Sequence, residues 1–345
     1  MRRRAVPRSL AREFSGRSAD FGLSPACLGS MVSAMTHRLI VLALASASAL
    51  HLSSCGPDVD LPIMAGNTQA AAAEGEMLFI KAKAADDAGK VRQAIKLYDR
   101  TATRFPFAAS AAQARFRQAE LLEQKGDVQA SFEAYDQFLS RFQGSGLYTT
   151  ALNRQAAMAQ AAADGDVKSS MLGLKTRLSL EKTVEMLGKL RDNAPKSATA
   201  AKAQFTIGQL YEGKQKGKLA IEAYRQLVRD HAGSSQAPEG LFRVGLILME
   251  EADRGNQNQA NLDLAREAYQ DYLIQYPGHS RNEEARKMLA NLGNRDLQRS
   301  YDIAEFYQKT GKLESAKVYY RDIVTRSKSG ALHDQARARL KELGE

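Results

Sequence analysis

The sequence predicts an all-α protein made of repeated helical hairpins, and three observations indicate this fold. After residue 70 the chain is dominated by Ala, Leu, Glu, Lys, Gln and Arg, which are good helix formers. Val, Ile and Thr are sparse there and never alternate with polar residues over the length of a strand, so we expect no sheet. A pattern of small and aromatic residues also recurs along the chain at nearly constant spacing.

The recurring pattern is a small residue, a second small residue twelve positions later, Tyr four positions further on and often Pro eight beyond that. The first copy is Ala82, Ala94, Tyr98 and Pro106. The other copies with this spacing are Ala119, Ser131, Tyr135 and Gln143; Gly208, Ala220 and Tyr224; and Ala304, Ala316 and Tyr320. Gly245, Ala265, Tyr269 and Pro277 fit if the turn between the two helices is enlarged by eight residues.

This pattern resembles the tetratricopeptide repeat, a pair of antiparallel helices of about 34 residues. The resemblance implies a tetratricopeptide-repeat helical solenoid over residues 74–345, with about five to six helix hairpins and a C-terminal capping helix near 331–342. Residues 147–195 would form one degenerate repeat, and residues 164–175 and 253–262 are expected to be inserted loops. The residues expected to end the first helices in a left-handed conformation are Gly89, Gly126, Gly217 and Gly311.

Residues 35–54 have the pattern of a secretory signal peptide, with a short basic start, an uncharged apolar stretch and small residues. The apolar stretch is shorter than the roughly 20 residues that a transmembrane helix needs. Leu52-Ser53-Ser54-Cys55 resembles the bacterial lipobox, which implies acylation of Cys55 at the start of the mature chain. Gly56 stands where the lipobox family places Asp for retention in the inner membrane, which implies a lipid-anchored protein of the outer membrane that faces the periplasm.

The remaining N-terminal segments follow from this signal. Residues 1–34 precede a complete signal and are expected to be a non-native extension, while residues 55–73 are expected to be a flexible tether. The alternative is cleavage at another place, which would leave Cys55 as a free thiol.

Composition and motifs exclude several classes of function. The net charge is +10, but +5 of it lies in residues 1–54, and acidic residues are interleaved with basic ones in the rest, so we expect no nucleic-acid partner. Cys27 and Cys55 both precede the helical region, and the His residues lack metal-ligand spacing. We find no catalytic or phosphate-binding motif, so we expect no enzyme activity, cofactor, metal or small-molecule substrate.

A second regularity lies three residues before the first small residue of each clear repeat. An aromatic residue stands there each time, namely Phe79, Phe116, Phe205, Phe242 and Tyr301. One interpretation is a ladder of apolar contacts in a partner-binding groove for a peptide, and the other is packing between successive repeats that narrows the groove. Polar residues one turn further on, Lys83, Glu120, Gln209 and Glu305, predict a groove of mixed character.

The N-terminal repeats also resemble those of the BamD family, lipoproteins of the machine that assembles outer-membrane β-barrel proteins. The family's run between its first two repeats is matched by Arg104-Phe105-Pro106-Phe107-Ala108-Ala109-Ser110-Ala111-Ala112-Gln113-Ala114, and its next turn by Gly126-Asp127-Val128-Gln129-Ala130. The resemblance implies binding to the barrel-forming subunit and to unfolded barrel precursors, with Phe79 and Phe116 as groove residues.

Two alternatives remain open. Ala203-x-Phe205-x-x-Gly208 is similar to periplasmic repeat proteins that coordinate cell division with peptidoglycan synthesis, which would imply a generic envelope scaffold. A purely structural bridge between membrane and cell wall would instead have polysaccharide partners.

Overall fold

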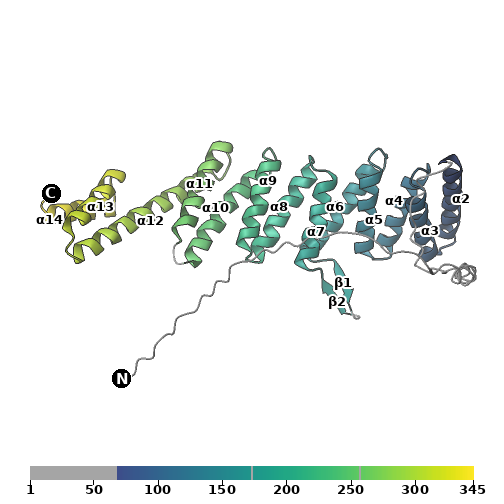
Figure 1. The fold of residues 1–345 in the computed structure, drawn as a ribbon, viewed down its shortest axis with the longest axis horizontal. Coiled ribbons are helices and arrows are strands. Elements are labelled where there is room, and N and C mark those ends of the chain that lie inside the picture. The colour runs from purple at the N-terminus through teal and green to yellow at the C-terminus, as the bar shows by residue number, and fades with distance from the viewer. Residues whose placement is uncertain (1–67, 172–173, 256–257) are drawn as a thin grey trace, which may run out of the picture. The chain divides into compact units, whose positions relative to one another are not determined.

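The computed structural model describes residues 68–171, 174–255 and 258–345, which belong to one compact unit (Figure 1). The predicted signal peptide at 35–54 and the predicted acylation site Cys55 lie outside these residues. Thirteen helices account for nearly all of the described regular structure, and one short pair of strands accounts for the rest.

The helices pack as successive antiparallel pairs, each against its neighbours along the chain (Figure 1). The pairs are α2 Thr68–Asp87 with α3 Val91–Arg104, α4 Ala111–Gln124 with α5 Val128–Arg141, α6 Tyr148–Asp164 with α7 Leu180–Asn193, α8 Ala198–Gly213 with α9 Gly217–Asp230, α10 Ala237–Arg254 with α11 Gln259–Gln275, and α12 Asn282–Lys309 with α13 Leu313–Arg326. A last helix, α14 Ala331–Glu342, covers α13 and α12 at the C-terminal end. The predicted hairpins and capping helix are therefore present, and residues 147–195 form the degenerate hairpin.

The small residues stand where the second helix of a hairpin comes closest to the first. A methyl group added to Gly245 would lie 2.6 Å from Cζ of the buried Tyr269 ring, and one added to Gly208 would overlap the ring of Tyr224. The side chains of Ala82, Ala119 and Ala304 are likewise fully buried. In the hairpins of Gly208 and Gly245 the Tyr ring of the second helix therefore lies against the small residue of the first helix.

The start of the array differs from the sequence prediction. Helix α2 begins at Thr68 and includes residues 68–73, which were expected to belong to the tether. The run of alanines at 70–73 explains this difference, because Ala is the best helix former.

The prediction that residues 253–262 form an inserted loop is wrong, because most of these residues are helical. Helix α10 continues nine residues past Gly245, whereas α8 continues five past Gly208. Helix α11 begins six residues before Ala265, whereas α9 begins three before Ala220. The eight extra residues thus lengthen both helices by about one turn each and add a single residue to the link between them.

The insertion at 164–175 contains a place where the expectation of no sheet is wrong. Strands β1 Lys168–Met171 and β2 Leu174–Arg177 pair antiparallel between α6 and α7, with Cα partners from Lys168↔Arg177 to Met171↔Leu174. Each strand has only four residues. A segment this short holds too few alternations of apolar and polar residues to be recognised in the sequence.

Turns between paired helices use a left-handed residue, as predicted at three of four positions. Gly89, Gly126 and Gly311 have φ of 68°, 79° and 75°. In the fourth turn Gln215 takes this conformation with φ 55°, and Gly217 is the first residue of α9. A side chain with a Cβ is strained in this region, so Gln215 is a local weak point.

Helix α12 joins two separate apolar clusters. Its N-terminal half contributes Ala285 and Leu292 to a cluster with α9, α10 and α11, and its C-terminal half contributes Tyr301 and Ala304 to a cluster with α13 and α14. No residue between Leu292 and Tyr301 is buried. The last hairpin therefore has a core of its own.

We predict that Gly245→Ala lowers the free energy of unfolding by about 1–3 kcal/mol, because the added methyl group overlaps the Tyr269 ring in a close-packed site. Gly188→Ala is the control, since a Cβ in that position of α7 meets no atom within 4 Å. The control should leave stability unchanged or raise it by up to about 1 kcal/mol. Urea unfolding followed by circular dichroism measures both, and equal effects of the two substitutions would contradict this account of the packing.

We predict that Gln215→Gly raises the free energy of unfolding by about 0.5–1 kcal/mol, because glycine adopts the positive φ of this turn without steric strain. Lys214→Gly should bring no such increase, because Lys214 has φ −95°. Thermal denaturation of the two variants beside the parent chain gives the comparison. A destabilised Gln215→Gly variant would show that the Gln215 side chain contributes more than the strain costs.

Candidate interaction surface

The five aromatic residues of the predicted ladder each pack against the recurring Tyr of their own hairpin. Ring centroids lie 5.7 Å apart for Phe79 and Tyr98, and 5.6 Å apart for Phe116 and Tyr135. The other pairs have similar separations, with 5.5 Å for Phe205 and Tyr224, 5.2 Å for Phe242 and Tyr269, and 5.5 Å for Tyr301 and Tyr320. Tilted and edge-to-face pairs at these separations stabilise packed cores.

Burial of these rings favours packing over an open groove, and the ring pairs lie within each hairpin, whereas the sequence analysis expected packing between repeats. Phe116, Phe242 and Tyr301 are buried, and Phe79 and Phe205 are half-buried. Of the five rings, only those of Phe79 and Phe205 are partly accessible to a partner. A role of the ladder in binding a peptide stays a prediction, while its role in packing each hairpin is visible in the contacts.

A recurring polar cluster, which the sequence analysis did not identify, lies beside these rings. In it, a carboxylate on the first helix of a hairpin accepts a hydrogen bond from the Tyr hydroxyl of the second helix and pairs with an Arg of the next hairpin. We call this arrangement the acid–Tyr–Arg clip. Its three clear copies are Asp86–Tyr98–Arg117, Glu123–Tyr135–Arg154 and Glu212–Tyr224–Arg243.

The distances of the clips are those of hydrogen-bonded ion pairs. Tyr224 Oη lies 2.6 Å from Glu212 Oε2, and Arg243 Nη1 lies 2.9 Å from the same oxygen. The first clip has 3.3 Å from Tyr98 Oη to Asp86 Oδ2 and 2.7 Å from Arg117 Nε to that oxygen. Each clip thereby joins three successive helices, two from one hairpin and one from the next.

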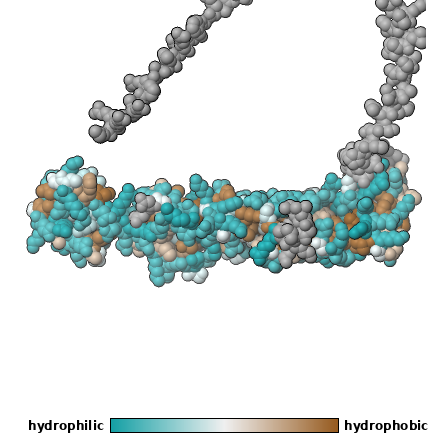
Figure 2. Space-filling model, turned by 90° about the horizontal axis from the view of Figure 1, so that it is seen from below, coloured by the Kyte–Doolittle hydropathy of each residue, from teal (hydrophilic) through white to brown (hydrophobic). Residues whose placement is uncertain are grey.

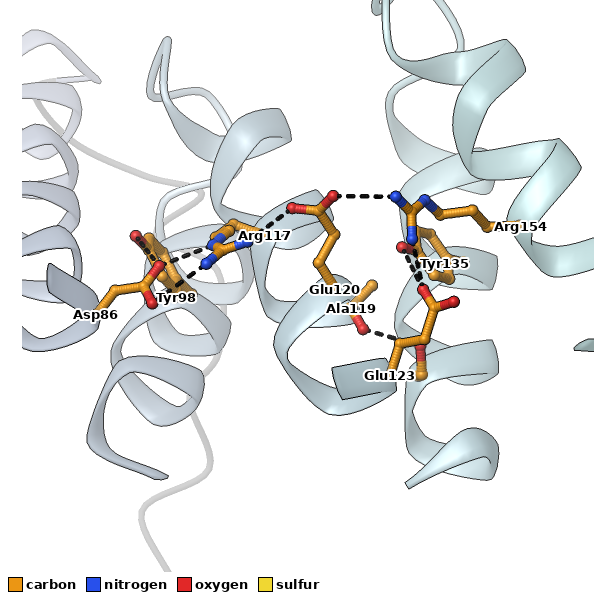
Figure 3. A network of polar contacts seen from close by, with 9 residues as sticks. Asp86, Tyr98, Arg117, Ala119, Glu120, Glu123, Tyr135 and Arg154 are labelled. Atoms are coloured by element: carbon orange, nitrogen blue, oxygen red, sulfur yellow. Dashed lines mark hydrogen bonds and ion pairs between the residues drawn. The ribbon is translucent and has the colours of Figure 1, made fainter. Parts of the chain in front are cut away.

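Further ion pairs connect the first two clips into one network (Figure 3). Glu120 lies between them and pairs with Arg117 at 3.0 Å and with Arg154 at 3.5 Å. Charges of alternating sign therefore run from α2 through α4 to α6. Each of the two cations therefore has two acidic partners, and the three carboxylates leave the network with one net negative charge.

A second network of the same kind runs through the middle of the array. Glu239 pairs with Arg243 and Arg281 at 2.8 Å each, and Arg281 also pairs with Glu284 at 2.8 Å. The guanidinium carbon of Arg281 lies 3.6 Å from the centroid of the Phe242 ring. Cations placed in this way stack on aromatic faces, so Arg281 covers a ladder ring that the groove interpretation would leave open.

Burial and the neighbouring carboxylates shift the titration of the clip residues. Burial, with the charge of Asp86 in second place, raises the pKa of Tyr98 to about 12. Burial likewise raises the pKa of Tyr135 and of Tyr224 well above the ordinary value. The hydrogen bond to Asp86 holds the pKa of Arg117 above its usual range. All of these groups keep the protonation state that the clips need at neutral pH.

A buried arginine is the other feature that spacing did not predict. Arg115 of α4 is almost fully buried, and its guanidinium donates to Asp99 and Thr103 of α3 at 2.6 Å each. It therefore ties the first hairpin to the second from within the helix interface. Burial lowers its pKa from the ordinary value of arginine, while Asp99 acts in the opposite direction.

The described residues contain neither a metal-ligand cluster nor a membrane-spanning helix. Within residues 68–171, 174–255 and 258–345, no three His, Cys, Asp or Glu side chains are grouped so as to hold a metal ion. None of the helices described there is long and apolar enough to cross a membrane. The surface beside the packed aromatic rings is polar and is crossed by networks of ion pairs.

Two segments match known sequence families. Models of the tetratricopeptide repeat match residues 81–146 and residues 297–329. These segments are tetratricopeptide repeats. They confirm the predicted all-α tetratricopeptide-repeat solenoid at both ends of the described array, and neither match indicates a catalytic family. Repeats of this kind bind other proteins, so the chain is an interaction scaffold.

Several solved structures are similar at low identity. One is the C-terminal part of a tetratricopeptide-repeat protein from Cytophaga hutchinsonii, with 12% identity, coverage of 76% of this chain and 87% of that one, and a TM-score of 0.31. YrrB, described as having an unusual peptide-binding site, has 15% identity, coverage of 66% and 92%, and a TM-score of 0.27. MamA from Desulfovibrio magneticus has 13% identity, coverage of 62% and 98%, and a TM-score of 0.26. No curated protein matches the chain.

We predict that the stability advantage of the parent chain over Tyr98→Phe shrinks by about 1 kcal/mol between pH 9 and pH 11. The folded pKa of Tyr98, about 12, lies above the unfolded value of about 10, so its contribution is complete below pH 10 and is lost as pH rises towards 12. Comparing the two chains at each pH cancels the titration of lysines that they share. Urea unfolding at pH 8, 9, 10 and 11 provides the measurement, and a difference independent of pH would refute the assigned environment of Tyr98.

Proposed function

We propose that this chain is a lipid-anchored tetratricopeptide-repeat scaffold of the outer-membrane β-barrel assembly machinery, facing the periplasm. It would bind a barrel-forming subunit, unfolded barrel precursors or both. The observation that carries the proposal is the sequence Leu52-Ser53-Ser54-Cys55 directly ahead of an array of protein-binding repeats. An acyl group at Cys55 would hold the array at a membrane surface, where barrel proteins are inserted.

The run from Arg104 to Ala114 also supports this proposal. It covers the end of α3, the turn and the start of α4, within the segment that matches the tetratricopeptide repeat. Its apolar residues Phe105, Ala108 and Ala111 form a buried cluster beneath α2. The similarity to the BamD family over this run therefore falls on residues that set how the first two hairpins pack.

The alternative is a scaffold that coordinates cell division or peptidoglycan synthesis. Its sequence support is Ala203-x-Phe205-x-x-Gly208. Phe205 packs on Tyr224, as the matching aromatic residue does in every clear hairpin, and Gly208 makes room for the same ring, as Gly245 does for Tyr269. The motif therefore describes repeat packing in general and does not favour one partner over another, whereas the lipobox-like sequence favours the first proposal.

We predict that the mature protein is acylated at Cys55, and that Cys55→Ala moves it from the outer-membrane fraction to the soluble periplasmic fraction. Each buried methylene of an acyl chain contributes about 0.8 kcal/mol to membrane binding, so loss of the chains removes most of the anchorage. Intact-mass spectrometry and membrane fractionation measure the two effects. Cys27→Ala is the matched control and should change neither.

A pull-down of the tagged parent protein from detergent-solubilised native membranes tests the partner. Recovery of an outer-membrane β-barrel protein with periplasmic domains is the expected result. Recovery of division or wall-synthesis proteins without a barrel protein would replace the proposal by the alternative. The same pull-down is made with the Cys55→Ala protein. A partner that binds the repeats should be recovered with both proteins, and in smaller amount with Cys55→Ala because this variant lacks the anchor.

A further inference from the structure

The third hairpin, α6 with α7, has the positions of a clip but not its charged residues. Arg154 of α6 belongs to the clip of the second hairpin, and a clip Arg stands two residues before the small residue of its helix, so the small residue of α6 is Ala156. The acid of a clip stands four residues after the small residue, where α6 has Gln160. The Arg is expected two residues before Gly208 of α8, where the sequence has Thr206.

The aromatic pair is also missing from this hairpin. The buried positions of α7 follow the spacing of those in α5, so Leu187 takes the place of Tyr135. The ladder position, three residues before the small residue, is occupied by Asn153, whose side chain is exposed. Smaller side chains have therefore replaced both rings that pack together in the clear hairpins.

A pocket of about 230 Å³ lies where these side chains are missing. Its lining includes all the positions of a clip, namely Ala156, Gln160, Leu187 and Thr206. Ala157, Leu190 and Ala203 add apolar side chains to its walls. The pocket is therefore the space that a Tyr ring and a clip fill in other hairpins.

The polar groups of the pocket indicate a tyrosine side chain as the occupant. In the last hairpin Gln308, which also stands in the place of the clip acid, accepts a hydrogen bond from Tyr320 Oη at 2.8 Å. Gln160 donates through its amide nitrogen to Asp164 at 3.0 Å, so its amide oxygen can accept in the same way. A tyrosine with its ring against Leu187 and its hydroxyl at Gln160 would restore the contacts that the other hairpins make within the chain.

This tyrosine has to come from another protein. All twelve tyrosines of the sequence lie in the described residues, and the side chain of each is buried or half-buried. A second folded copy of the chain therefore offers no exposed tyrosine. Residues 1–67 contain none, so the chain's own N-terminal segment does not supply one either.

Lys202 indicates the chemistry beside the tyrosine. Its exposed side chain is part of the pocket lining, and its ammonium group forms no ion pair within the described part of the chain. None of the described residues that line the pocket is acidic. A carboxylate next to the tyrosine of the partner would therefore find a cation without an ionic partner.

The surroundings of such a pocket can remain polar. On the face drawn in Figure 2, hydrophobic residues form separate patches within a largely hydrophilic surface. Protein interfaces concentrate binding energy in a few buried aromatic side chains and surround them with polar contacts. A partner segment held by one tyrosine is consistent with a surface of this kind.

We propose that the pocket between α6, α7 and α8 binds a tyrosine side chain of a partner protein, in a segment that carries a carboxylate next to that tyrosine. The tyrosine supplies the ring that the third hairpin lacks, and the carboxylate pairs with Lys202. This inference deepens the proposed function and rests on it, because it names one contact that the scaffold makes with its partner. It does not depend on the lipid anchor at Cys55.

Selection from a phage-displayed library of random linear peptides tests the pocket. The target is the full-length Cys55→Ala protein, which needs no detergent that could enter the pocket. We expect the enriched peptides to carry Tyr next to Asp or Glu. Ala157→Trp places a large ring in the pocket from an exposed position and should lose these peptides, whereas Ala84→Trp, at an exposed alanine of α2, is the matched control and should keep them.

Fluorescence anisotropy with the most enriched peptide measures the tyrosine contact. Changing its Tyr to Ala should weaken binding at least about tenfold, and changing it to Phe about threefold, because the hydroxyl group loses Gln160. Gln160→Ala should abolish the difference between the Tyr and Phe peptides. A merely structural role of Gln160 would leave that difference unchanged.

The same peptide measures the charge contact. Lys202→Ala should weaken its binding about threefold, and the effect should disappear at about 1 M salt. Lys196→Ala is the matched control at another exposed lysine and should have no effect.

Other results would overturn the proposal. These are a selection that enriches no peptide, enriched peptides without Tyr, and Tyr peptides that bind Ala157→Trp as tightly as the parent. A dimer in analytical ultracentrifugation that Ala157→Trp abolishes would overturn it in favour of a second copy. Recovery of wall-synthesis proteins in the pull-down would overturn the proposed function alone, while a Tyr and acid motif from the selection would still support the pocket.

Discussion

In each hairpin that carries a clip, a single tyrosine takes part both in the packing of that hairpin and in the attachment of the next one. The ring of Tyr224 lies against Gly208 and Phe205, so the two helices approach only because the first lacks a side chain at that point. The hydroxyl of the same residue donates to Glu212, and that carboxylate then receives Arg243 of the next hairpin. The apolar contact and the polar contact are made by opposite ends of one residue, so a change at Tyr224 disturbs both the hairpin and its junction.

The two kinds of contact have different weights. The clip ion pairs are partly exposed, and pairs of this kind contribute about 0.2–1 kcal/mol each, so they add little to the total free energy of folding. Burial of apolar rings and helix faces contributes more per residue. The clips specify which face of a helix meets the helix of the next hairpin. The Arg of one helix and the carboxylate of the other are aligned in this register, and in any other register the ion pair would be lost. Arg115 shows the same principle inside the core, where its bonds to Asp99 and Thr103 compensate for a buried charge.

The sequence predicted the hairpins and their number because small residues and Tyr at fixed spacing leave few ways to pack two helices. It did not reveal the clips, since Asp86, Tyr98 and Arg117 are separated by 12 and 19 positions and the acid is Asp in one copy and Glu in others. The sequence analysis assigned the left-handed conformation to Gly217 because glycine adopts it most easily. The residue that has this conformation is Gln215, two positions earlier. The ladder was correctly identified as a regularity, but spacing alone does not distinguish a ring that faces a groove from a ring that packs on Tyr.

The eight residues inserted between Gly245 and Ala265 show one change of length that this architecture accommodates. Each helix of this hairpin is longer by a number of residues close to the 3.6 of one helical turn. The apolar face of each helix therefore keeps its original direction. An addition of two residues to one helix would rotate everything beyond it by about half a turn and separate Tyr269 from its glycine. The α10–α11 hairpin is therefore longer by about one turn in each helix at the end where the turn joins them, while the paired faces keep their alignment.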